Sequence, residues 1–145
     1  MPRSAKWRLL AAQEHAMPGF MTLQAIRDGG HVVDFVWDFA SASAARLLGH
    51  KALDLVGKRL LDVFAGDLAH PAVFDQYRRV AESGAGEAIQ QVHVVDGVED
   101  TYRHCAVRLA DGVAVTLTNL SAVRRAHALR LEVSALQAMN ANYIR

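Results

Sequence analysis

The sequence predicts an α+β domain, in which a five-stranded antiparallel sheet carries short helices on one face and is flanked by a helix at each end. Short apolar runs with a two-residue period are separated by turn signals, which predicts strands joined as hairpins. Two such runs precede a helical region and three follow it. Strands paired through hairpins form an antiparallel sheet, and the helices between the hairpins must cover one of its faces.

The first element is expected to be a helix over residues 4–16, where Trp7 and Leu10 recur at helical spacing. Pro18 follows it, and proline cannot continue a helix. Residues 1–17 are therefore expected to form a helix that precedes the domain proper.

The first hairpin is expected at residues 20–26 and 31–39, around the turn signal at 28–30. Alternation along the second strand predicts one face that points inward and one that points outward. The expected inward residues are Val33, Phe35, Trp37 and Phe39. The expected outward residues are Val32, Asp34, Val36 and Asp38.

Helices fill the middle of the chain. Short ones are predicted at residues 41–48 and 52–56, because each is a helical run closed by glycine. A longer helix should open at Pro71 and carry an apolar stripe as far as Ser83.

Three more strands are expected at residues 88–95, 101–109 and 113–118. Asp-Gly pairs at 96–97 and 111–112 should make the two hairpin turns between them. These three strands complete the sheet.

The helical period returns at residue 119 and continues to the end of the sequence. Leu129, Leu136 and Tyr143 are seven residues apart, and Val133 and Met139 lie near the same seam. This spacing is typical of a helix that pairs with another helix. We expect residues 119–145 to be the truncated first part of a longer helix, paired weakly in a homodimer.

Composition narrows the class of protein. The 145 residues include 16 basic and 15 acidic side chains scattered along the chain, so no broad basic surface for nucleic acid is expected. The sequence has no uninterrupted run of about 18 apolar residues, so membrane insertion is not expected. The single cysteine, Cys105, cannot form an internal disulfide, which fits a cytoplasmic protein.

Local fragments in this order resemble the PAS domain family, in the form found in bacterial sensory and regulatory proteins. Together they cover about residues 20 to 125. Ser41-Ala42 departs from the Asn-Pro that members often show, and Asn119 and Ser121 replace the Asp and Thr of the family's Asp-Ile-Thr motif. The fragments that carry the resemblance are residues 33–37, 44–49, 55–58, 61–64, 74–80, 84, 111–117 and 119–121.

The resemblance implies a cytoplasmic module for signal transduction, with a PAS domain at residues 18–118. Such modules bind a small ligand or a partner, and residues Asn119, Leu120 and Ser121 would relay a conformational signal into the C-terminal helix. PAS modules stand upstream of diguanylate cyclases and other cyclic-di-GMP enzymes, or of histidine kinases in two-component systems. A ligand-free PAS domain that only dimerises its effector is the alternative.

The interior candidates for a ligand pocket come from the strands and the long helix, and ordinary core packing is the competing interpretation for each. The candidates are Phe35, Trp37, Phe39, Val73, Tyr77, Cys105, Val107 and Val115. The candidate dimer residues are Leu129, Val133, Leu136, Met139 and Tyr143.

The cofactor is unknown from the sequence. His70 lies just ahead of the long helix, where some haem-binding relatives supply an axial imidazole, so a haem-based gas or redox sensor is a further alternative. His93 and His104 are expected to be hydrogen-bonded structural residues. Cys105 lies in a strand and outside any flavin-adduct motif, so flavin is not expected.

Catalysis within the chain is not expected either. The sequence has no phosphate-binding glycine loop, nucleophile elbow or His-Glu-x-x-His motif. The carboxylates expected in outward or loop positions without a partner are Asp34, Asp38, Asp62 and Asp67. The sequence therefore predicts a regulatory domain and no protein-bound metal.

Overall fold

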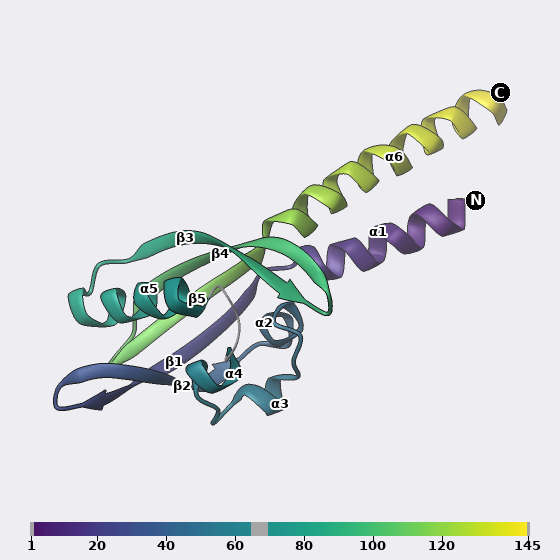
Figure 1. Ribbon diagram of the computed structural model, residues 1–145. Helices are drawn as coiled ribbons and strands as arrows, with labels where there is room; N and C mark the ends of the chain where they lie inside the picture. The colour runs from purple at the N-terminus through teal and green to yellow at the C-terminus, as the bar shows by residue number, and fades with distance from the viewer. Residues whose placement is uncertain (1, 65–69, 145) are drawn as a thin grey trace.

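The computed structural model describes residues 2–64 and 70–144, apart from the side chains of residues 2–5, 70 and 142–144. Five strands form one antiparallel sheet in the order β2-β1-β5-β4-β3 (Figure 1). The strands are β1 (Gly19–Asp28), β2 (His31–Ala40), β3 (Glu87–Val95), β4 (Val98–Arg108) and β5 (Gly112–Asn119). The predicted α+β class with a five-stranded antiparallel sheet is confirmed.

Four helices lie against one face of the sheet, and two longer helices project together from one end of it (Figure 1). The covering helices are α2 (Ala42–Leu47), α3 (Ala52–Leu55), α4 (Leu60–Val63) and α5 (His70–Ser83). The projecting helices are α1 (Pro2–Ala16) and α6 (Leu120–Ile144). The chain therefore enters and leaves the domain on the same side.

The hairpin turns follow local backbone chemistry. Gly29 and Gly30 have φ of 57° and 86°, as a two-residue turn between strands requires. Asp96 and Gly97 make the same kind of turn between β3 and β4.

The last hairpin differs from the prediction, because its turn lies one residue earlier than the Asp111-Gly112 pair. Ala110 has the positive φ, and Gly112 is already in β5. Gly112 is needed for another reason, since a Cβ there would lie 2.0 Å from the carbonyl oxygen of Leu23. The glycine allows β5 to approach β1 closely.

Strand β2 does not alternate regularly, and the expected assignment of its faces is wrong at four positions. Its register against β1 skips Val33 and Asp38, so the strand carries two β-bulges. Each bulge adds one residue and changes which neighbours point inward. Val32 and Asp34 are consequently buried, whereas Val33 and Phe39 are exposed.

Asp34 gains a structural role from its inward position, contrary to the expectation of an outward carboxylate without a partner. Its Oδ1 accepts hydrogen bonds from the backbone N–H groups of Phe35 and Leu61, at 2.7 and 3.1 Å. Leu61 lies in the first turn of α4, so Asp34 satisfies a free donor at the start of that helix. The bulge thereby joins the first hairpin to the covering helices.

Two of the other carboxylates can also be placed. Asp38 accepts hydrogen bonds from Thr22 and Gln24 on the outer face of the sheet, so it too has partners. Asp62 is exposed in α4, and Asp67 lies outside the described residues. Across the described residues, no helix is long and apolar enough to cross a membrane.

Candidate functional site

The interior between the sheet and α5 is built from aromatic side chains. Phe35 packs edge-on against Tyr77 with ring centroids 6.0 Å apart, and Trp37 packs in the same way against Phe64. Rings in this geometry interact favourably beyond the area that they bury. Five of the predicted pocket residues are at most 1% exposed here: Phe35, Trp37, Val73, Tyr77 and Val115.

Three predicted pocket residues point away from this interior, so the expectation for them is wrong. Phe39 is 47% exposed and packs on Phe20 at the outer face of the sheet. Val107 is 56% exposed, and Cys105 lies with it on the outer side of β4. The inner side of β4 carries polar residues at alternate positions, which the apolar pattern could not indicate.

Those inner positions bring together two histidines that the sequence did not link. The Nε2 atoms of His93 in β3 and His104 in β4 are 2.8 Å apart, and the Nδ1 atom of His104 is 2.8 Å from the Tyr77 hydroxyl. His93 is 2% exposed and His104 is fully buried. The expectation that each is hydrogen-bonded is confirmed, and that neither binds a ligand stays a prediction.

The electrostatic state of His104 follows from its surroundings. Burial, with a smaller contribution from His93, lowers the pKa of His104 to about 3, so its imidazole is neutral at pH 7. Burial likewise raises the pKa of the Tyr77 phenol well above its ordinary value. A neutral imidazole donates from one nitrogen and accepts at the other, so the three groups form a directed hydrogen-bond chain.

Gln76 precedes Tyr77 in α5 and bonds to β3 and β4 beside this hydrogen-bond chain. Its Nε2 donates to the carbonyl oxygens of Glu87 and His104, at 3.0 and 2.9 Å. Its Oε1 is buried without a hydrogen-bond partner among the described residues. The amide orientation is fixed, because the opposite orientation would place oxygen against two carbonyl oxygens.

The pair of histidines could have been found from the turn between β3 and β4. The two-residue turn at Asp96 and Gly97 fixes the register of these strands, which places His93 opposite Asp100 and His104 opposite Ile89. Both histidines then share the face of Tyr102. The turn residues and the strand lengths are therefore the signal in the sequence that brings the two histidines together.

The described residues alone bear on the question of metal binding. No group of three or more His, Cys, Asp or Glu side chains that could hold a metal ion occurs within the described ranges. Helix α5 begins at His70, but the side chain of His70 lies outside what the structure describes. Its role as a haem ligand stays a prediction.

A second polar cluster fixes the start of α6. The Oδ1 atom of Asn119 accepts from the Ala122 N–H at 2.9 Å, so Asn119 caps the helix as predicted. Its Nδ2 atom donates to Asp100 at 2.9 Å. Ser121 accepts from the Thr101 N–H at 3.0 Å, and Leu120 between them is partly buried.

Asp100 and Arg125 complete this cluster and were not among the predicted residues. Both guanidinium nitrogens of Arg125 lie 2.9 Å from the Asp100 carboxylate. The hydrogen bond to Arg125 lowers the pKa of Asp100 and outweighs its partial burial. The cluster attaches the first turn of α6 to both β4 and β5.

The seam predicted for dimer pairing faces α1 of the same chain. Leu129, Val133 and Leu136 are partly buried there, whereas Met139 is 65% exposed and lies off the seam. The side chain of Tyr143 lies outside the described residues. Pairing of these residues in a dimer stays a prediction.

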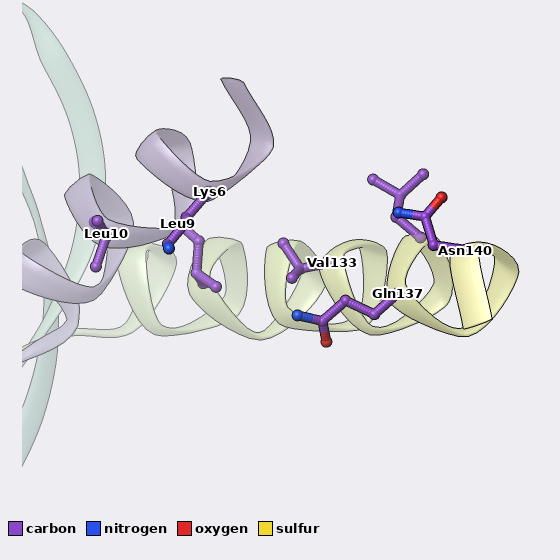
Figure 2. A pocket seen from close by; sticks show the side chains of 7 residues that line it. Lys6, Leu9, Leu10, Val133, Gln137 and Asn140 are labelled. Atoms are coloured by element: carbon purple, nitrogen blue, oxygen red, sulfur yellow. The ribbon is translucent and has the colours of Figure 1, made fainter. Parts of the chain in front are cut away.

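The contact between α1 and α6 leaves a groove between the two helices. Figure 2 shows a groove between the two helices, with a volume of about 300 Å³. Its lining residues are Lys6, Leu9, Leu10, Val133, Leu136, Gln137 and Asn140. Among the described side chains, Arg8 of α1 and Glu132 of α6 form an ion pair at 3.1 Å, and both side chains are about half exposed.

The family model described as PAS fold matches residues 26–125, which is more than half of the chain. Among solved structures, an RNA-binding light-oxygen-voltage receptor is similar at 19% identity and a TM-score of 0.55, over 86% of this chain and 33% of that one. The chain thus spans about a third of that receptor's length, and at this identity the likeness shows the fold alone.

Two further structures are less similar. A domain of an HTR-like protein from Haloarcula marismortui is 19% identical with a TM-score of 0.49, over 70% of this chain and 96% of that one. The phytochrome PAS-GAF-PHY module of Stigmatella aurantiaca is 21% identical with a TM-score of 0.46, over 70% of this chain and 19% of that one. Among curated proteins, no sequence matches the chain.

Proposed function

The chain belongs to the PAS fold family, and from that premise we propose that it is a sensory module that converts the state of its interior into a change at α6. A small ligand or a partner biases the sheet between two states, and residues Asn119, Leu120 and Ser121 pass that bias to the helix. A ligand acts in this way only if it binds one state more tightly than the other.

The observation that carries the proposal is the junction of β5 and α6. Strand β5 ends at Asn119 and helix α6 begins at the next residue, so no loop separates them. Asn119 is 3% exposed and bonds both to Asp100 and to the first turn of α6. A shift of β5 must therefore move the helix or break these bonds.

Support for a ligand comes from the buried Gln76 Oε1, which has no hydrogen-bond partner among the described residues. Buried polar atoms are nearly always hydrogen-bonded in proteins, so an acceptor left over calls for a donor from water or from a bound molecule. The dense aromatic packing of Phe35 and Trp37 supports the other candidate, a ligand-free dimerisation module.

The cellular setting belongs to the same proposal. We place the module in the cytoplasm as a homodimer that controls an effector domain, by preference a cyclic-di-GMP enzyme and next a histidine kinase. The family resemblance supports the effector classes, and the heptad spacing of Leu129 and Leu136 supports pairing. The module is regulatory, and catalysis resides in the effector.

Native mass spectrometry of the purified chain, together with its absorption spectrum, tests the proposal. We expect a bound small molecule that denaturation releases. A mass equal to that of the bare chain, in a protein that still dimerises, would instead establish the dimerisation module. A Soret band would identify haem, and its loss in His70→Ala would assign the axial ligand.

A further inference from the structure

Buried polar side chains form a continuous line from α5 to the start of α6. The line begins with the Tyr77 hydroxyl on His104 and continues to His93, with 2.8 Å at each contact. We call it the polar line, and its members are Tyr77, His104, His93, Tyr102 and Asn119. Each member is at most 3% exposed.

The middle of the polar line passes from β3 back to β4. The ring of His93 lies edge-on to that of Tyr102, with centroids 5.0 Å apart. Tyr102 is fixed at its far end, because its hydroxyl donates to the carbonyl oxygen of Leu47 in α2 at 2.8 Å. Its ring therefore cannot follow His93 without strain on α2 or on its own strand.

The end of the polar line is the cap of α6. Tyr102 lies directly opposite Asn119 across β4 and β5, so their side chains are on the same face of the sheet. Asn119 in turn accepts from Ala122, and its partner Asp100 holds Arg125. A displacement of Tyr102 consequently reaches three contacts that hold the first turn of α6.

We propose that the polar line is a two-state relay that couples the interior beside α5 to the first turn of α6. The inference rests on the proposed function, since it names the route by which the sensory module acts on its output helix. It also predicts coupling in the isolated chain, whether or not a ligand is bound.

Two states arise from the two tautomers of His104. Either Tyr77 donates to His104 Nδ1 and His104 Nε2–H donates to His93, or His93 Nε2–H donates to His104 and His104 Nδ1–H donates to the Tyr77 oxygen, whose own proton then turns to another acceptor. The two arrangements place the hydrogen of His93 on different ring nitrogens, so they favour different positions of that ring against Tyr102. A change in the hydrogen bonding of the Tyr77 hydroxyl therefore fixes the tautomer of His104 and the role of His93 Nε2.

The forward test removes the Tyr77 hydroxyl and observes α6. In Tyr77→Phe we expect amide hydrogen exchange of residues 122–126 to change at least about fivefold, the lower end of usual coupling between sites. Val80→Ala is the matched control, because Val80 is fully buried in the same helix and is apolar. It should lower global stability and leave exchange at residues 122–126 unchanged.

The reverse test uses the fact that equilibrium coupling must act equally in both directions. Arg125→Ala removes the ion pair between Asp100 and α6, and it should shift the imidazole ¹⁵N resonances of His104 and His93. Arg27→Ala is the control, because Arg27 makes a similar two-pronged pair with Asp111 at the other end of the sheet. It should leave both histidines unchanged.

The relay is supported only if both tests give an effect and both controls do not. It is overturned if Tyr77→Phe and Val80→Ala affect α6 alike, or if Arg125→Ala leaves the histidine resonances in place. A chain that retains a ligand but fails these tests is a sensor with another route. If the chain gives the expected results in both tests but retains no ligand, the relay stands and only the proposal of a bound ligand is rejected.

Discussion

The interior of the sheet and the α1–α6 helix pair are built in opposite ways. Trp37 in the interior is 1% exposed, whereas Trp7 on α1 is 61% exposed. None of the described side chains of α1 is fully buried, and the two helices leave a groove between them. We therefore expect the interior to contribute most of the stability and the helix pair to contribute less.

This difference suits a signalling device. Packed interiors respond to change as a unit, because their side chains interlock. Loosely packed helices have conformations close in free energy, which small biases can redistribute. The contacts of Asn119 and Asp100 join the two regions, and the predictions below test each region against the other.

The largest difference is expected between the two tryptophans. Trp37→Ala should lower the free energy of unfolding by about 3–5 kcal/mol, because it leaves a cavity in the core. Trp7→Ala should change it by less than about 0.5 kcal/mol, as at most exposed sites. Urea denaturation measures both, and equal losses would show that α1 is part of the core.

Acid should act mainly on the interior. Because the pKa of folded His104 is about 3 and that of a free imidazole is about 6.5, the unfolded chain takes up a proton that the folded chain does not. Stability should therefore fall below pH 6.5 by about 1.4 kcal/mol per pH unit, or roughly 3 kcal/mol in all by pH 4.

Denaturation curves between pH 4 and 7 check this slope. His104→Gln should reduce it, whereas His127→Gln, on the exposed side of α6, should not. The window stops at pH 4 because the low pKa of Asp100 contributes its own loss of stability in stronger acid. A wild-type curve without a slope above pH 4 would contradict a neutral buried His104.

The junction should show an intermediate effect. Asn119→Ala removes the cap of α6 and should lower the free energy of unfolding by about 1–2 kcal/mol. Ser41→Ala is the matched control, since Ser41 caps α2 by accepting from the Ala44 N–H. Hydrogen exchange should increase at the start of α6 only in the first variant. An identical exchange pattern in both would separate Asn119 from the output helix.

The smallest effect is expected within the helix pair. A double-mutant cycle on Arg8→Ala and Glu132→Ala should give a coupling of less than about 1 kcal/mol, as is usual for exposed ion pairs. Salt should weaken it further. A coupling above 2 kcal/mol would show that α1 is held firmly and would remove the contrast between the regions.

The fold was predictable because its signals are local. Turn pairs such as Gly29-Gly30 and Asp96-Gly97 define hairpins by backbone chemistry alone, and their order gives the sheet. The bulges of β2 were not predictable in this way. Val33 and Phe39 are as apolar as Phe35, so composition cannot tell which of them the added residues turn outward.

The candidate site was predictable only where burial and apolar character agree. Trp37, Tyr77 and Val115 were placed correctly in the interior for that reason. His93 and His104 are polar residues whose burial is made tolerable by each other, and such mutual dependence appears only when the strands are paired. Cys105 and Val107 were wrongly assigned to the interior for the opposite reason, because they are apolar but lie on the outer side of β4.

The bulges in β2 also determine where the chain can change length. Omission of both Val33 and Asp38 would leave an ordinary alternating strand in which Val32, Phe35, Trp37 and Ala40 keep their inward positions, and omission of either one would remove one bulge. The losses would be confined to the Asp34 contact with Leu61 and to the Asp38 contacts with Thr22 and Gln24. One-residue insertions and deletions among homologues should therefore concentrate at these two positions, because such changes leave the buried core residues in place.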